Sequence, residues 1–394
     1  MTRHFQIKKF FREAPNNKLS CYFHEKNLLS DVDFEQLNET DIEPVFKEYI
    51  SLPMDKRIEI EGDFKDLFTM SYEGGYKTIL EVGKIYGEDL EPIISELDGF
   101  YDVAFWSFFE RREIFDKALQ FCNLNDLPKR YWKKRPDLPE VEAETNQKYI
   151  KDLENAVIDF FRSNEGRGHN CKIDHHKLGD KDYFFAYPED YTRLFIEWEN
   201  DKFEQVRHKL AFEIIFVYSE NERTLDIYYE GSYEVVRDLQ VIFCKNILKK
   251  DVERLYKDKK VYELDVLKDR NFQFVFEPTD GIEDVLVKKL RFSFFFESKK
   301  RFILEADPSY NRYAVYDLME QLIMNDSELK SYKIPLDDLK ITQVTIQVKF
   351  KPDGKRGKNT KTFDVSYPNS CSLKNEGRDL ILRKMLIASK IEPH

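Results

Sequence analysis

The chain has 394 residues, of which 41% are hydrophobic, 15% aromatic and 35% charged. This composition is typical of a packed globular protein and excludes long disordered stretches. The net charge of −11 argues against indiscriminate binding along nucleic acid, although a local basic patch still acts over a Debye length of about 8–10 Å.

The location expected from the sequence is cytoplasmic. No apolar run approaches the roughly 20 residues that a membrane-spanning helix needs, so no contact with a membrane is expected. Residues 1–15 lack the apolar segment and the cleavage site of a secretory signal. The five cysteines are widely scattered, which is typical of free thiols in a reducing compartment.

Residues 1–127 are expected to form an all-helical domain. Their apolar side chains recur mostly at helical spacing, and glycine is confined to a few breaks. In "VAFWSFFERREIFDKALQFC", for example, Phe105, Phe108 and Phe115 lie on one broad face.

Residues 128–144 carry the clearest linker signal, because three prolines interrupt any helix. The segment is also basic, and its charged and aromatic side chains suit the binding of a phosphate backbone with stacking on bases. The candidate nucleic-acid-binding residues here are Lys129, Arg130, Trp132, Lys133, Lys134 and Arg135. The alternative is a solvated linker that lies along a domain boundary.

Residues 145–394 are expected to form an α+β domain. After the helix "NQKYIKDLENAVIDFFRS", strand patterns come in pairs, as in "KIDHHKLGDKDYFFAYP" and "AFEIIFVYSENERTLDIYYEG". "YPEDYTR", which follows the first of these hairpins, is expected to be a strand end and a turn. Strand–turn–strand–helix modules then recur at about residues 211–250, 287–325 and 340–391.

Antiparallel hairpins whose helices return across one face build a helix-backed sheet. The fold class predicted for the whole chain is therefore α+β: an all-helical N-terminal domain followed by an antiparallel sheet domain of repeated modules.

"EGRGHNCKIDHH", residues 165–176, holds the densest group of metal-binding residue types. On a strand His169, Cys171 and His175 would share one face, which gives three weak candidate zinc ligands without an assigned fourth. The favoured interpretation is structural: Gly166 or Gly168 takes a positive φ and ends the preceding helix, and Cys171 packs inward.

Signatures of catalysis are absent from the sequence. There is no phosphate-binding loop, dinucleotide fingerprint, nucleophile elbow or zinc-protease motif, and no cofactor is expected. Asp280 with Glu297 and Lys299 has the residue spacing of a metal-dependent nuclease, but Glu297 and Lys299 are predicted at a hairpin turn.

The hairpin loop "KFKPDGKRGKNTK", residues 349–361, is the second basic candidate for contact with nucleic acid. Its cations outnumber its acidic residues, and contacts of this kind hold a phosphate backbone without distinguishing base sequences. The candidate residues are Lys351, Lys355, Arg356 and Lys358. The alternative is a lysine-rich loop that serves solubility alone.

The segments "FFREAPN", "GRGHNCKI", "DYFFAYPEDY", "AFEIIFVYS" and "PNSCSLK" span nearly the whole chain. Together they resemble an uncharacterised bacterial protein family with no named activity. The resemblance implies a bacterial intracellular protein that is one component of a multi-protein system, such as a defence against phage, and it assigns no catalytic residue.

The leading hypothesis from the sequence is a non-enzymatic binding or scaffold protein that acts through a protein partner or through self-association. The rival hypothesis is a protein that binds nucleic acid, or cleaves it with a metal ion, through the two basic segments. A third is an unrecognised metal-dependent hydrolase.

Overall fold

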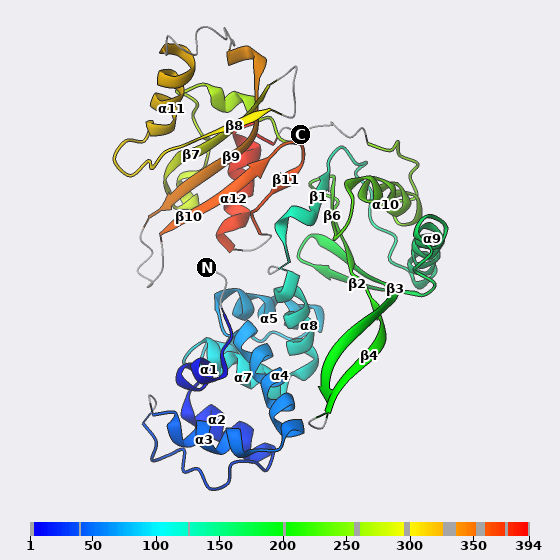
Figure 1. The fold of residues 1–394 in the computed structure, drawn as a ribbon, viewed down its shortest axis with the longest axis vertical. Coiled ribbons are helices and arrows are strands. Elements are labelled where there is room, and N and C mark those ends of the chain that lie inside the picture. Colours follow the sequence, from blue (N-terminus) through cyan, green and yellow to red (C-terminus); the bar gives the residue numbers. More distant parts are fainter. Residues whose placement is uncertain are drawn as a thin grey trace. The chain divides into compact units, whose positions relative to one another are not determined.

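The computed structural model describes residues 4–38, 41–124, 127–199, 202–255, 261–294, 300–325, 336–351, 359–374 and 377–392. The chain divides into two compact units: Met1–Leu127 with Leu194–Arg207, and Pro128–Arg193 with His208–His394. The fold is α+β, as predicted, with helices first and two antiparallel sheets after them (Figure 1). Among the described residues, no helix is both long and apolar enough to cross a membrane.

The N-terminal part of the first unit is helical. Aromatic side chains from three of its helices fill the core: the rings of Phe10 and Phe64 are stacked 4.4 Å apart, and those of Phe10 and Phe105 are 6.2 Å apart. The helices are α1 (Ile7–Glu13), α2 (Asn16–Glu25), α3 (Glu43–Ser51), α4 (Met54–Met70), α5 (Glu73–Ile85), α6 (Glu91–Ile94), α7 (Phe100–Glu110) and α8 (Arg112–Leu124).

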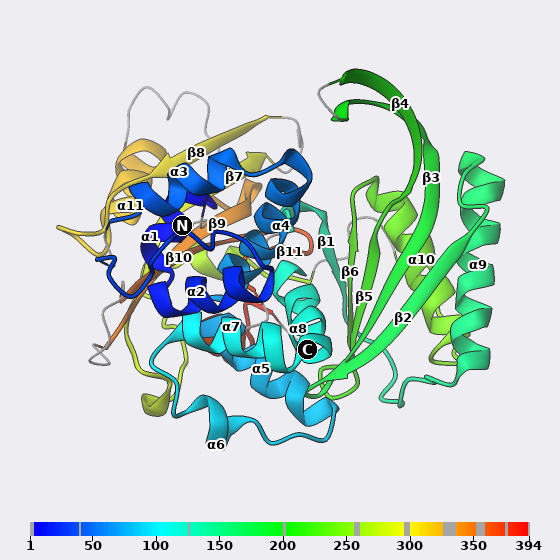
Figure 2. The same ribbon diagram turned by 90° about the horizontal axis from the view of Figure 1, so that it is seen from below.

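The second unit begins with a sheet that two helices cover on one face. The order of its strands is β1-β6-β5-β3-β2, and β4 pairs with β3; the end of β3 and most of β4 belong to the first unit. Figure 2 shows α9 and α10 on one face of this sheet, where apolar residues from both helices and from the strands form one buried cluster. The elements are β1 (Trp132–Arg135), α9 (Gln147–Glu165), β2 (Cys171–Leu178), β3 (Lys181–Glu199), β4 (Lys202–Ala211), β5 (Ile214–Ser219), β6 (Thr224–Tyr229) and α10 (Tyr233–Asn246).

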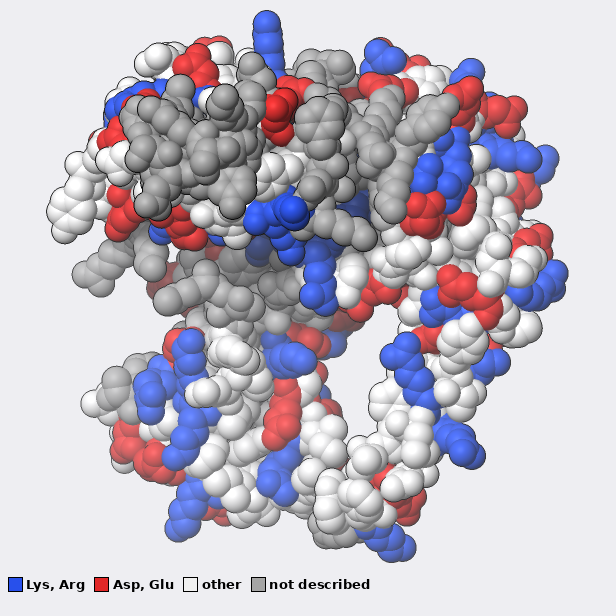
Figure 3. Space-filling model, turned by 45° about the horizontal axis from the view of Figure 1, so that its top comes forward, with Lys and Arg blue, Asp and Glu red and all other residues white. Residues whose placement is uncertain are grey.

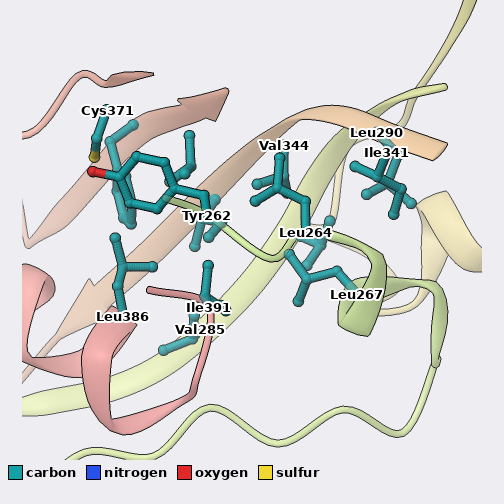
Figure 4. Packing of buried hydrophobic residues seen from close by; sticks show 14 of the residues in the cluster. Tyr262, Leu264, Leu267, Val285, Leu290, Ile341, Val344, Cys371, Leu386 and Ile391 are labelled. Carbon is teal, nitrogen blue, oxygen red and sulfur yellow. The ribbon is translucent and has the colours of Figure 1, made fainter. Parts of the chain in front are cut away.

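A second sheet follows in the order β11-β10-β9-β7-β8. Its core includes Leu386 and Tyr262, and the hydroxyl of Tyr262 points toward Cys371 in Figure 4. The elements are β7 (Ile282–Phe294), β8 (Arg301–Glu305), α11 (Ala314–Met319), the π-helix η4 (Glu320–Asn325), β9 (Leu339–Phe350), β10 (Thr360–Ser366), β11 (Ser370–Cys371) and α12 (Gly377–Ala388). Short 3-10 helices are η2 (Asp265–Lys268), η3 (Pro278–Asp280) and η6 (Leu336–Asp338).

The repeated modules are divided between the two sheets. The module at residues 211–250 contributes β5, β6 and α10 to the first sheet, whereas the other two build the second sheet. Residues 128–144, expected to be a linker, contribute η1 (Lys129–Tyr131) and the edge strand β1. Trp132 to Arg135 pair with Tyr228 to Leu225 of β6, so β1 gains its hydrogen bonds from a strand some ninety positions later.

The expected turn at "YPEDYTR" is wrong, because β3 continues through it to Glu199. Pro188 and Asp190 are turn-favouring residues, but the stretch after them is rich in strand-favouring side chains such as Tyr191, Ile196 and Trp198. Beyond Pro188 the continued strand pairs with β4. The two strands form a long hairpin, and its distal part is called the arm below (residues 192–199 of β3 and 202–209 of β4).

Candidate partner-binding surface

The arm exposes large apolar side chains to solvent. Leu194 is 54% exposed, Ile196 64% and Trp198 66% on β3, and Phe203 on β4 is 55% exposed. Soluble proteins expose single apolar residues routinely, but several on one small element mark a surface for interaction. The arm, at the lower right of Figure 3, shows uncharged atoms with lysine, arginine and acidic side chains around them.

These four side chains share one face of the arm. Successive side chains of a strand point to opposite faces, so Leu194, Ile196 and Trp198 point the same way. The Phe203 ring contacts the Trp198 ring with centroids 5.4 Å apart, which places Phe203 on that face as well. By the same alternation Arg207 also belongs to this face, which therefore combines an apolar strip with a cation.

The arm also has strand edges that no described strand covers. Beyond Pro188 the only described partner of β3 is β4, and β4 in turn pairs with β3 alone. An unpaired edge presents backbone N–H and C=O groups that can accept a further strand. The apolar face and the open edges therefore occur on the same element.

The base of the arm is fixed by Arg167, which lies in the glycine-flanked segment after α9. Its Nη1 donates to Oδ1 of Asp190 at 2.6 Å, and its Nη2 donates to the Tyr229 hydroxyl at 3.0 Å. Its guanidinium also lies 4.0 Å from the centre of the Phe212 ring, which adds a cation–π contact. The "GRG" segment therefore joins α9 to the strands from which the arm extends.

Asp190 is buried and charged in this network. Burial alone would raise the pKa of its carboxyl, but hydrogen bonds from Arg167 and from the Tyr191 backbone N–H outweigh burial and lower that pKa. The carboxylate therefore stays ionised at neutral pH, and both charges of the pair are compensated.

The glycines of this segment take the conformations that the sequence predicts. Gly166 ends α9 with φ +69°, and Gly168 follows with φ +79°. The N–H of Gly168 donates to the carbonyl of Glu189 at 2.9 Å, so the turn is attached to the strand that enters the arm. Cys171 packs against the buried cluster beneath α9, as expected, beside the fully buried Ile173.

The three weak candidate metal ligands are not brought together. His169 is exposed in the loop before β2, whereas Cys171 and His175 lie on β2 itself. Four residues along a strand span about 13 Å, so two ligands at that spacing cannot bind one ion. His175 instead places Nε2 at 2.7 Å from Oδ1 of Asp182. Among the described residues, no cluster of three histidine, cysteine or acidic side chains is placed to hold a metal.

A shallow groove of about 350 Å³ lies between α9 and the base of the arm. Burial raises the pKa of the Cys171 thiol in this groove to about 12, which keeps it a neutral and weak nucleophile. The groove's lysines pair with carboxylates, as Lys151 does with Glu154 at 2.7 Å and Lys209 with Glu189. The lining residues are Lys151, Ile158, Asn170, Cys171, Lys172, Tyr187, Glu189, Lys209, Leu210 and Ala211.

The basic segment before α9 turns two of its cations inward. Lys134 is 4% exposed, and its Nζ lies 2.6 Å from Oε1 of Glu392. Arg135 is 6% exposed. Because neither side chain reaches solvent in this conformation, neither is presented to a phosphate backbone.

The other candidates of this segment remain at least partly accessible. Lys129, Trp132 and Lys133 are half-buried, and Arg130 is exposed. Lys133 donates to the carbonyl of Arg130 at 2.8 Å. Binding of nucleic acid at these four residues stays a prediction.

The second basic candidate lies mainly outside the described residues. Lys351 is exposed after β9, whereas Lys355, Arg356 and Lys358 are not described. The same holds for Glu297 and Lys299 of the nuclease spacing, whose partner Asp280 takes part in a capping box with Glu277. Both hypotheses stay predictions.

The sequence interpretation missed the arm. Its signal is the recurrence of Leu194, Ile196 and Trp198 at every second position, with Glu197 and Glu199 on the opposite face, although Phe195 interrupts the alternation. The chain matches none of the protein-family models and none of the curated proteins with which it was compared.

Proposed function

We propose that this protein is a binding or scaffold protein that recognises a protein partner, or a second copy of itself, through the arm. The observation that carries the proposal is the exposed strip of Leu194, Ile196, Trp198 and Phe203. Burying one such side chain contributes about 1.5–3 kcal/mol, and aromatic residues commonly dominate the energy of an interface.

The side chains and open edges of the arm also indicate the chemistry of the partner. Arg207 lies beside the apolar strip, so a partner with an apolar surface and a nearby carboxylate complements it. A partner with an extended segment would gain backbone hydrogen bonds at the open edges of the arm as well. The resemblance to a bacterial family supports a cytoplasmic setting within a multi-protein system, such as one directed against phage.

The test replaces the two aromatic residues of the strip. The double variant Trp198→Ser/Phe203→Ser should lose the self-association that light scattering detects for the full chain, or the partners that co-purify with it from its native host. Its circular dichroism and unfolding midpoint should match those of the unchanged protein, because both side chains are more than half exposed.

Tyr310→Ser is the matched control, since Tyr310 is an aromatic residue 99% exposed outside the arm. It should leave every interaction unchanged. The proposal would be contradicted if the protein without substitutions were a monomer that has no partners. It would also be contradicted if the double variant kept the same partners.

A further inference from the structure

The two faces of the second sheet differ in polarity. Apolar side chains such as Leu290, Phe292 and Val344 point into the buried cluster to which α11 and α12 contribute. Because successive side chains of a strand point to opposite faces, the residues between them form the other face, called the outer face below. Ile303 of β8 lies on the outer face and is 55% exposed, so this face is open to solvent at β8.

Three cations of the outer face lie at one end of the sheet, where β8, β7 and β9 run side by side (Figure 1). Arg301 of β8 and Lys340 of β9 both pair in register with Ser293 of β7, one from each side. Arg291 precedes Ser293 by two residues on β7 and therefore shares its face. Adjacent strands are about 4.8 Å apart, so the three long side chains start within about 10 Å of one another. They are called the basic patch below (Arg291, Arg301 and Lys340).

The guanidinium of Arg291 is held in a fixed orientation. Its Nε donates to Oγ1 of Thr342 at 3.0 Å, and its Nη2 donates to the carbonyl oxygen of Thr342 at 3.1 Å. Its Nη1 donates to no described residue, and the side chain as a whole is half-buried. Gln343 pairs with Arg291 in register and offers an amide donor beside it. Two nitrogens therefore position Arg291, and a third is available to a ligand.

The other two cations of the patch reach solvent more freely. Arg301 is exposed on β8, which is an edge strand of the sheet. Lys340 is half-buried, and its Nζ lies 3.5 Å from the centre of the Tyr367 ring. This cation–π contact orients the ammonium group but does not neutralise its charge.

No described carboxylate forms an ion pair with the basic patch. Glu305 lies on the same strand as Arg301 but about 13 Å further along it. Asp364 lies on β10, two strands away from Arg291. Burial and the nearby Arg301 lower the pKa of Arg291, and the opposing effect of Asp364 is smaller. Like charges that lie close together on a sheet are destabilising, so a bound anion would stabilise this end of the sheet.

We propose that the basic patch binds the phosphate backbone of a single-stranded nucleic acid. Arginine and lysine N–H groups are common donors to phosphate oxygens, and hydrogen bonds between opposite charges are the strong ones. An exposed sheet face suits an extended polymer, whereas small ligands are usually held in concave pockets. The whole chain carries a net charge of −11, so attraction depends on this local group of cations, which acts over a Debye length of about 8–10 Å.

The patch shares no residue with the arm or with the two basic segments predicted from the sequence. The inference therefore goes beyond the proposed function and does not depend on it. The cations come from three strands that the sequence does not show to be neighbours, which is why sequence spacing did not reveal the patch.

The site is tested by fluorescence anisotropy of labelled single-stranded DNA and RNA, each of mixed sequence, titrated with the full chain. We expect at least one of the two to bind, with an affinity that falls as salt rises, because phosphate contacts release condensed counterions. Arg301→Glu/Lys340→Glu should weaken binding by about tenfold or more. It should also lower the slope of log affinity against log salt by about 2, roughly 1 for each phosphate contact removed.

Lys47→Glu/Lys65→Glu is the matched control, because it makes the same change of net charge at two exposed lysines of the helical domain. It should bind as the unchanged protein does. Gln343→Ala removes a neutral donor, so it should weaken binding without changing the salt slope. Circular dichroism and the unfolding midpoint verify that each variant is folded.

The proposal is refuted if the unchanged protein binds neither oligonucleotide, or if the control variant loses as much affinity as the patch variant. It is also refuted if poly-glutamate of equal charge displaces the oligonucleotide as well as unlabelled oligonucleotide does, since the patch would then not recognise phosphate. If Arg301→Glu/Lys340→Glu does not fold, Arg301→Glu alone decides the question. This single variant should lower the salt slope by about 1, and an unchanged slope and affinity refute the site.

Discussion

At the scale of single residues, the two glycines after α9 differ in their surroundings although both have a positive φ. A Cβ at Gly166 would meet nothing within 4 Å, whereas a Cβ at Gly168 would lie 2.8 Å from the Cβ of Phe161. We expect Gly166→Ala to lower the free energy of unfolding by about 1–2 kcal/mol, the cost of a left-handed alanine. Gly168→Ala should cost about 2–5 kcal/mol, because overpacking adds to that strain. Urea unfolding measures both, and equal losses would contradict the assigned close contact.

Asp190 provides a prediction about pH. Asp190→Asn should lower the free energy of unfolding by about 1.5–3 kcal/mol at pH 7, because the acceptor of the hydrogen bond from Arg167 becomes neutral and the buried guanidinium loses its counter-charge. The folded-state pKa of Asp190 lies below the unfolded value of about 3.9, so its stabilisation is present above pH 4 and disappears as pH falls through the folded-state pKa.

The difference between the unchanged protein and Asp190→Asn should therefore shrink when urea unfolding is repeated below pH 4. Asp251→Asn, at an exposed carboxylate, is the control and should change little at either pH. If this difference in the free energy of unfolding were the same at pH 7 and pH 3, the charge of Asp190 would make no contribution to stability, and only its packing would.

The sequence predicts the backbone conformation of single residues such as glycines. It does not predict which charged side chains are buried by residues far away in the chain. The positive φ of Gly166 and Gly168 follows from their own residue type and from the end of a helical pattern. Lys134 and Arg135 resemble surface cations in the sequence, because the groups that bury them, such as Glu392, lie more than a hundred positions away. Burial of a charge depends on partners that sequence spacing does not identify.

At the scale of elements, α10 offers a test of helix capping. The Oγ of Ser232 accepts a hydrogen bond from the N–H of Val235, which satisfies one donor of the first turn. Ser232→Ala should therefore lower the free energy of unfolding by about 1 kcal/mol in urea. Ser51→Ala, at the exposed C-terminal end of α3, removes no such cap and should change stability by less than about 0.5 kcal/mol. Equal effects would contradict a capping role.

The hairpins show which strand features the sequence patterns predict and which they miss. The β2–β3 and β5–β6 hairpins were predicted because their strands alternate and turn residues separate them. The extension of β3 beyond Pro188 was missed because proline and acidic residues are strong turn signals, although here the following aromatic and β-branched residues continue the strand. The division of the modules between two sheets was also missed, because a repeated pattern does not say which strands pair.

At the scale of the whole molecule, one buried ion pair links the two sheets of the second unit. Lys134 belongs to β1 of the first sheet, and Glu392 follows α12, which packs on the second sheet. Their side chains are 4% and 8% exposed, and Glu222 lies 3.8 Å from the same lysine. Such a pair couples its two sides, because loss of Lys134 leaves the buried Glu392 without its hydrogen-bond partner.

We therefore expect Lys134→Met to lower the free energy of unfolding by about 3–5 kcal/mol, since it leaves Glu392 buried and unpaired. The double variant Lys134→Met/Glu392→Leu should recover a large part of this loss, because apolar side chains of similar size often replace a buried pair without cost. Urea unfolding followed by circular dichroism gives both values. Lys77→Met breaks an exposed pair with Glu73 and should cost less than about 1 kcal/mol. If the double variant lost as much free energy of unfolding as Lys134→Met and Glu392→Leu lose together when measured separately, the two side chains would act independently. Their ion pair would then not couple the two sheets.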